Sequence, residues 1–276
     1  MYLPSVHAEE HIPTLRQLIR DFPLGVLTTA IPSTTGPFIQ SSHIPFLLDV
    51  GDESSETEMG TLRGHMARVN PQSKAMIEGV SQKQKQSANN NGSEAAAPSN
   101  DFLTEEVLVL FTSPVQHYVT PKFYTETKPT TGKVVPTWNY AAVQAYGRAK
   151  IYFDTRSEET GAFLSQQIAD LSQYAETSIM GYTGSSSGAA DPANPANPAP
   201  WQVSDSPEKY IGLLKKAIIG IEIEIDRLEG KFKMSQEMGA GDRAGVAEGF
   251  RGLGTETAAG VAELVKQRGD MKKGSR

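Results

Sequence analysis

The spacing of apolar residues predicts one amphipathic helix near the start of the chain, followed by a series of strands. Between Ile12 and Phe22 apolar residues recur every three or four positions, the stripe of a helix, and Pro23 ends it. The period then falls to two. Strand-like runs, bounded by Gly, Pro, Ser and acidic residues, occupy residues 24–31, 38–50, 59–65, 106–111, 134–153 and 221–226.

Two of these runs carry further signals. Pro45 cannot donate a ladder hydrogen bond, so its strand is expected to lie at a sheet edge or at a bulge. Ile221, Ile223 and Ile225 alternate with acidic residues, which predicts one buried face and one face in contact with water or a partner.

Three more helices are expected later in the chain. One spans about residues 158–174, and the last begins at Thr255. Between them, Ser206 has the character of an N-cap, with Pro207 at the first helical position.

These elements predict a single domain over residues 1–276, mainly β with peripheral helices (α+β), built on an antiparallel barrel. Residues 81–100 and 181–200 contain too few apolar residues to offset the entropy of ordering, so both are expected to be flexible insertions. The basic tail, residues 269–276, is expected to be flexible as well.

Composition excludes several classes of protein. The chain has no cysteine, which excludes disulfides, thiolate metal sites and a cysteine nucleophile. The five histidines are scattered and none belongs to an H-E-x-x-H motif, so no metal site is expected. A net charge of −6 offers no general attraction to phosphates, and direct nucleic-acid binding is not expected.

The expected location is intracellular and cytoplasmic, with a nuclear location left open. No apolar run approaches the roughly 20 residues of a membrane span. The first residues lack the basic and apolar regions of a secretory signal.

One candidate binding segment follows the third predicted strand. Within LRGHMARVNP, His65, Arg68 and Asn70 offer a switchable donor, a planar cation and an amide close together. These groups suit a phosphate monoester, which favours charge-assisted hydrogen bonds. The same residue types also fit a capped strand end with a surface arginine.

A second candidate region is rich in polar aromatic residues. Residues 113–124 and 133–140 combine tyrosine, tryptophan and histidine rings with hydroxyl, amide and ammonium groups. Flat rings edged by such groups suit a planar heteroaromatic ligand such as isoalloxazine. Stacked aromatic residues in a core would give the same composition.

Taken in order, the motifs of this chain resemble the PaiB family of FMN-binding split-barrel proteins. They include MYLP at the start, HIPFLLD (43–49), GHMARVNPQ (64–72), GKVVPTWNY (132–140) and LEGKFKMSQ (228–236). The resemblance covers nearly the whole chain apart from the two insertions and the tail. It implies a six-stranded antiparallel split β-barrel, usually a homodimer, with FMN at the subunit interface.

The resemblance also implies which residues contact the flavin. His65, Arg68 and Asn70 would surround the phosphate and the ribityl chain. The remaining contacts, some of them from the second subunit, would come from His43, Pro45, Phe46, Pro136, Thr137, Trp138, Asn139, Lys233, Ser235 and Gln236. Whether GKVVPTWNY forms a wall of the flavin site or the dimer seam stays open.

Three functions remain in competition. The leading hypothesis is an FMN-binding, oxidoreductase-like flavoprotein, for which no catalytic residue is singled out. Because PaiB-like proteins are commonly labelled negative transcriptional regulators, a regulator acting through a small-molecule ligand or partner is the second. Kinship with haem-degrading split barrels makes haem the alternative cofactor.

Overall fold

The structure is a computed structural model that describes residues 1–34, 36–90, 101–184 and 197–274. In this part of the chain the strands form one antiparallel sheet in the order β3-β2-β6-β8-β9-β5-β4. The strands of this path are β2 (Leu24–Ala30), β3 (Ile39–Pro45), β4 (Leu47–Asp49), β5 (Thr61–Ala67), β6 (Val107–Thr112), β8 (Thr137–Tyr152) and β9 (Ile218–Lys233).

The sheet curls into a barrel because its two edges belong to one stretch of chain. β3 pairs with β2 and β4 pairs with β5, yet only Phe46 separates β3 from β4. Counting β3 and β4 as one bent strand gives six strands along this path, which confirms the antiparallel split barrel. Pro45 is the last residue of β3, at the edge where its missing N–H is tolerated.

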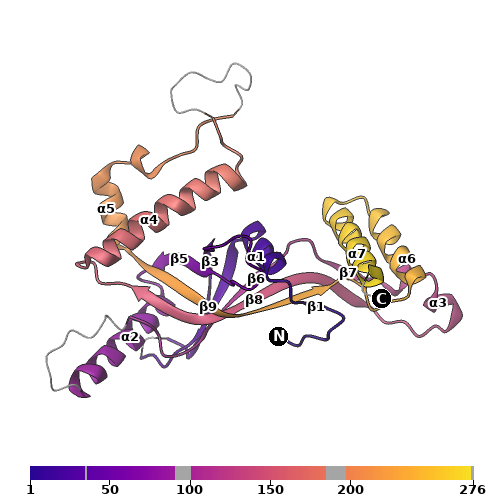
Figure 1. The fold of residues 1–276 in the computed structure, drawn as a ribbon, viewed down its shortest axis with the longest axis horizontal. Coiled ribbons are helices and arrows are strands. Elements are labelled where there is room, and N and C mark those ends of the chain that lie inside the picture. Colours follow the sequence, from indigo (N-terminus) through magenta and orange to yellow (C-terminus); the bar gives the residue numbers. More distant parts are fainter. Residues whose placement is uncertain (35, 91–100, 185–196, 275–276) are drawn as a thin grey trace.

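The longest pairing joins β8 to β9, and it extends beyond the barrel. In Figure 1 these strands cross the molecule from α4 and α5 at one end to α6 and α7 at the other. Beyond the barrel, β8 pairs with β7 (His117–Val119) and β9 pairs with β1 (Ala8–Glu9). We call this extension, residues 137–141 of β8 and 231–233 of β9, the arm.

A bulge explains the sequence pattern of β9. The register shifts between Tyr146 and Gly147, and Asp226 is left without a Cα partner. Because side chains alternate along a strand, one extra residue exchanges the two faces. Ile221, Ile223 and Ile225 therefore point inward before the bulge, whereas Phe232 points inward after it. Gly147 is required here, since a Cβ would lie 2.0 Å from the Glu224 carbonyl oxygen.

Helices cover the barrel and the arm. α1 packs against the inner face of the β8–β9 pair, where Leu15 lies against Gly230. α4 covers the outer face of β5 and β9, and α6 and α7 form a hairpin beside the arm. The helices are α1 (Ile12–Asp21), α2 (Pro71–Asn90), α3 (Thr127–Thr130), α4 (Glu158–Tyr174), α5 (Glu208–Lys216), α6 (Ala240–Arg251) and α7 (Glu256–Gly274).

Several sequence predictions need correction. Residues 81–90, expected to lack regular structure, continue α2, whose buried Ala75, Met76 and Val80 anchor it to the barrel. Residues 269–274 of the expected tail belong to α7. The other parts of these segments, residues 91–100, 185–196 and 275–276, lie outside the described residues. Pro207, and not Ser206, is the N-cap of α5.

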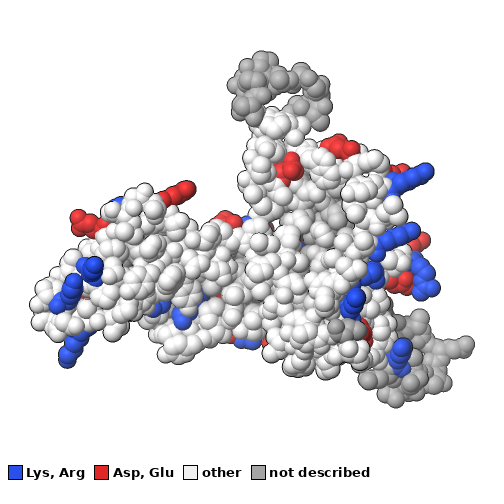
Figure 2. All heavy atoms as spheres, turned by 180° about the vertical axis from the view of Figure 1, so that it is seen from behind, with Lys and Arg blue, Asp and Glu red and all other residues white. Residues whose placement is uncertain are grey.

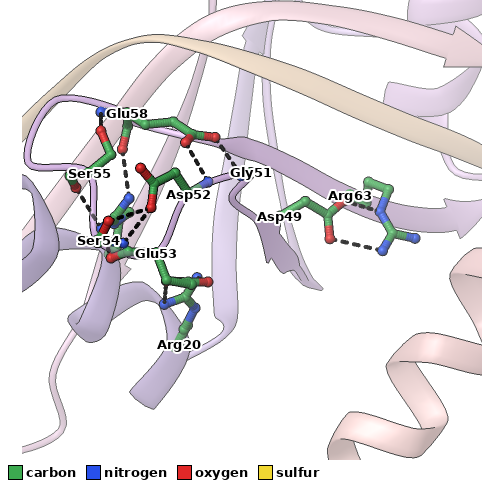
Figure 3. A network of polar contacts seen from close by, with 10 residues as sticks. Arg20, Asp49, Gly51, Asp52, Glu53, Ser54, Ser55, Glu58 and Arg63 are labelled. Carbon is green, nitrogen blue, oxygen red and sulfur yellow. Dashed lines mark hydrogen bonds and ion pairs between the residues drawn. The ribbon is translucent and has the colours of Figure 1, made fainter.

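A buried arginine organises the acidic loop between β4 and β5. Arg16, on α1, is 1% exposed and donates to the carbonyl oxygens of Glu53, Ser55 and Glu58. The Glu58 carboxylate in turn accepts hydrogen bonds from the amides of Gly51 and Asp52, as Figure 3 shows. These two amides are the main reason that the pKa of Glu58 is lowered. The loop therefore depends on α1 for its shape.

At the edge of the same network Arg63 connects three elements. Its guanidinium binds Asp49 of β4 (Figure 3) and, at 2.9 Å, Asp170 of α4. The hydrogen bond that the guanidinium donates to Asp49 is the largest cause of the raised pKa of Arg63. This residue ties α4 to the barrel edge.

Arg16→Met should destabilise the protein by about 3 kcal/mol, because three buried charge-assisted hydrogen bonds are lost together. Urea unfolding at neutral pH measures the change. Arg20→Met is the matched control: Arg20 pairs with the exposed Glu53, and its removal should cost less than about 1 kcal/mol. Equal losses for the two variants would contradict the role given to Arg16.

Candidate functional site

The predicted FMN contacts form two groups at opposite ends of the β8–β9 pair. The first group, here called the β5-end cluster, consists of His65, Arg68 and Asn70. All three lie at or just after the C-terminal end of β5, which pairs with the start of β9.

Arg68 holds the ends of neighbouring elements together. Its guanidinium donates to the carbonyl oxygens of Phe153 at 2.5 Å, Lys216 at 3.2 Å and Ile218 at 3.4 Å. Its backbone N–H bonds the carbonyl oxygen of Ala217 at 2.9 Å. Arg68 thus fastens the end of β8 and the junction between α5 and β9, as expected of a capped strand end.

The hollow beside Arg68 is not strongly basic. This cavity of about 600 Å³ has Arg68 and Arg156 in its lining together with Asp101, Asp154 and Glu159. Two cations against three carboxylates give no net attraction for an anion. Any phosphate contact at this end therefore relies on Arg68 and His65 themselves.

Asn70 caps helix α2. Its side-chain oxygen accepts from the Gln72 N–H at 2.9 Å, and its amide donates to the Ser42 hydroxyl at 3.1 Å. Pro71 follows at the first helical position, the usual place for proline. Asn70 therefore joins β3 to the start of α2.

His65 carries an unused polar atom. The side chain lies on the outer face of β5, opposite Gly220 in register, and the Phe163 ring of α4 lies against Gly220. Nδ1 of His65 is buried and has no hydrogen-bond partner among the described residues. Burial lowers the pKa of His65, because the charged imidazolium is disfavoured there.

The side chains of the HIPF segment, residues 43–46, point in different directions. His43 is exposed on the outer face of β3, and Pro45 is half-buried. Phe46 is 1% exposed and points into the barrel, where its ring meets Phe111 edge-on at 6.1 Å. Phe46 is therefore a core residue, and its side chain supports the barrel wall from inside.

The second group, here called the arm cluster, lies where β8 begins and β9 ends. It consists of Thr137, Asn139, Lys233, Ser235 and Gln236. The Lys233 ammonium donates to the Thr137 hydroxyl across the β8–β9 pair, and the Gln236 amide donates to the carbonyl oxygen of Phe232.

Asn139 and Ser235 form the buried centre of the arm cluster. Both are fully buried, and the Asn139 amide lies 3.0 Å from the Ser235 hydroxyl. Ser235 has φ of 58°, a left-handed conformation that is uncommon outside glycine. A buried hydrogen bond at such a residue fixes the turn that carries Gln236 away from β9.

Trp138 lies on the opposite face of the arm and is exposed. It is 49% exposed, and its indole N–H donates to Gln116 Oε1 at 3.2 Å. The Tyr118 ring, 44% exposed, meets it edge-on at 6.3 Å. Val135, 72% exposed, precedes the exposed Pro136. Trp138 and Tyr118 therefore form a surface, whereas Tyr124 of the same aromatic region is 4% exposed and lies in the core.

One chain does not bring the two groups together. From Asn139 to Phe153 the strand is about 45 Å long at 3.3 Å per residue. A single FMN molecule is much shorter than this path. The motifs of the sequence do not indicate that Tyr118 and Gln116 are partners of Trp138. The pairing of β7 with β8 places Tyr118 directly opposite Trp138.

Comparison with known proteins places the chain in a family. The family described as "Putative FMN-binding domain" matches residues 1–227 of the 276. The chain belongs to this family, and FMN is the cofactor that the family binds. The α6–α7 hairpin lies beyond the matched residues.

Curated relatives agree with this assignment. An uncharacterized protein of Aspergillus fumigatus is 58% identical over 277 residues and covers 99% of both chains. The protease synthase and sporulation protein PAI 2 of Bacillus subtilis is 25% identical over 164 residues, 59% of this chain and 64% of its own length. The PaiB resemblance is therefore confirmed.

Solved structures of similar shape are more distant. The flavocytochrome Anf3 of Azotobacter vinelandii is 9% identical with a TM-score of 0.42, over 84% of this chain and 72% of that one. An FAD- and haem-binding protein of Mycobacterium smegmatis is 12% identical with a TM-score of 0.42, over 82% and 73%. Neither likeness is close enough to assign a ligand.

Two searches of the structure gave negative results. In residues 1–34, 36–90, 101–184 and 197–274, no helix is long and apolar enough to cross a membrane. In the same ranges no three His, Asp or Glu side chains come together as a metal site.

The lowered pKa of His65 predicts a pH-dependent stability. As pH falls, the unfolded chain takes up a proton near pH 6.5, before the folded chain does. The contribution of neutral His65 to the free energy of unfolding is therefore fully present above about pH 6.5. It is lost as pH falls from there to the lowered pKa of His65 in the folded chain. Urea unfolding between about pH 8 and about pH 5 should show the wild type losing more stability than His65→Gln. The exposed His11→Gln should follow the wild type, and parallel curves for all three proteins would contradict the assignment.

Proposed function

We propose that two copies of this chain bind FMN between them, with the β5-end cluster of one copy facing the arm of the other. One observation carries the proposal: apart from those of the HIPF segment, the predicted contacts lie at or near the two ends of the β8–β9 pair. A homodimer resolves this separation, because a twofold axis brings one end of each copy to the opposite end of its partner.

The residues at the two ends fit different parts of FMN. At the β5 end, Arg68 is a planar cation and His65 has an unused buried nitrogen, groups that suit the phosphorylated tail. On the arm, Trp138 exposes a flat ring with the Tyr118 ring of β7 edge-on to it and the Gln116 amide at its rim, which suits a planar ring with a polar rim.

The activity we propose is flavin-dependent electron transfer. Bound FMN supplies the redox chemistry, and the chain binds it, orients it and keeps water from one face. No residue of either cluster needs to act as a strong acid or base. On the face drawn in Figure 2, Lys and Arg side chains lie at both ends of the molecule and do not gather in one patch. This distribution supports a ligand-binding role over direct contact with nucleic acid.

Arg68→Ala should weaken FMN binding about tenfold to hundredfold, because a charge-assisted contact to phosphate contributes about 1.5 to 3 kcal/mol. Quenching of flavin fluorescence during titration measures the dissociation constant. Riboflavin, which has the same ring and no phosphate, is the control ligand. Its affinity should not change in the variant. An equal loss for both ligands would show that Arg68 only holds the strand ends.

A mixing experiment tests whether the site is shared. Arg68→Ala and Trp138→Ala proteins should each bind FMN weakly. After subunit exchange each mixed dimer regains one intact site, so about a quarter of all sites should recover flavin absorbance near 450 nm. His65→Ala in place of Arg68→Ala repeats the test with a residue that fastens no strand ends. If neither mixture recovers binding although mixed dimers are present, the two clusters do not form one site between subunits, and the proposal fails.

A further inference from the structure

A groove between α1 and α7 borders the arm, whose Ala141 and Phe232 line it. It has a volume of about 490 Å³, and no residue of the β5-end or arm cluster lines it. One wall belongs to the matched family residues, and the other belongs to α7, beyond residue 227. The groove is therefore built where the C-terminal hairpin meets the barrel.

The floor of the groove is apolar. Leu18 and Phe22 come from α1, Val115 follows β6, Phe232 comes from β9, and Leu264 comes from α7. Gly260 keeps α7 close to this floor, because a Cβ there would lie 2.9 Å from Val115. The lining suits a flat apolar body.

The positive charge of Arg268, which lines the groove, is already neutralised. Arg268 forms an ion pair with Glu9, and its guanidinium lies 3.9 Å from the centre of the Phe232 ring. The Arg268 side chain is 11% exposed. Its positive charge is therefore unavailable to attract an anion.

Two carboxylates on opposite walls lack this compensation. Asp21 of α1 and Glu263 of α7 are exposed and line the groove. Asp21 accepts a hydrogen bond from the Gln17 amide at 2.7 Å. Neither carboxylate forms an ion pair with any described residue. The uncompensated charge of the groove is negative on both sides.

We propose that this groove binds a small molecule with a flat apolar body and one cationic group. The body would lie on Phe22, Val115 and Leu264, and the cation would lie between Asp21 and Glu263. The volume falls within the roughly 300 to 1,000 Å³ of small-molecule sites, whereas a protein partner would need about 800 Å² of surface per side. The site is independent of FMN binding.

A pair of probes tests both the shape and the charge. 2-(1-Naphthyl)ethylammonium and 3-(1-naphthyl)propanoate share the ring and differ in the sign of the charge. Fluorescence titration of the full-length protein should give at least about fivefold tighter binding of the ammonium probe, consistent with two weak ion pairs. Asp21→Asn with Glu263→Gln should remove this preference. Glu256→Gln, at the start of α7 and outside the groove, should leave it unchanged.

A filling variant locates the binding. Gln267→Trp places a large ring at an exposed groove position and should weaken both probes at least tenfold, without changing the mass of the protein in solution. Equal affinity for the two probes, or a preference for the propanoate, would overturn the proposal. So would unchanged binding in Gln267→Trp, or a change of oligomeric mass in that variant, which would assign the groove to a second copy of the chain.

Discussion

The pairing of β8 with β9 determines most of this structure. Thirteen consecutive Cα pairs, interrupted by one bulge, run from Tyr140 and Lys233 to Tyr152 and Gly220. Within the barrel the pair supplies two walls, and beyond it the pair carries the arm and the α6–α7 hairpin. Because a strand is rigid and extended, groups at its two ends cannot meet within one chain.

This constraint gives the candidate site its character. In the β5-end cluster, Arg68 and Asn70 have a structural role, because both form hydrogen bonds to protein atoms. The arm cluster has a buried, strained centre at Asn139 and Ser235, which holds an exposed aromatic face in place. In the proposed shared site, these hydrogen bonds would hold the side chains of each half in place, which lowers the entropy that binding must overcome.

The barrel could be predicted from the sequence, because the spacing of apolar residues within each segment indicates whether that segment is a strand or a helix. α1 and α4 appear where their apolar stripes place them, and Pro45 marks the edge of β3. The polar half of α2 was missed, because its stability comes from the Asn70 cap and a buried first half, not from its own composition.

The candidate site was less predictable for a physical reason. Residue types at His65, Arg68 and Asn70 indicate polar contacts but not whether the partner is a ligand or the protein backbone. The structure shows backbone partners for Arg68, a helix cap for Asn70 and an unpaired nitrogen for His65. Phe46 looks the same in sequence whether it faces a flavin or the core. Only the direction of each side chain separates these alternatives.

The absence of cysteine allows a direct test of the shared site. Val69→Cys marks the β5 end and Val135→Cys marks the arm, at positions that are 75% and 72% exposed. The two proteins, one isotopically labelled, are mixed with FMN, treated with a short bis-maleimide and analysed by mass spectrometry. The account predicts a link between position 69 of one copy and position 135 of another. Copies that associate without forming this link would contradict it.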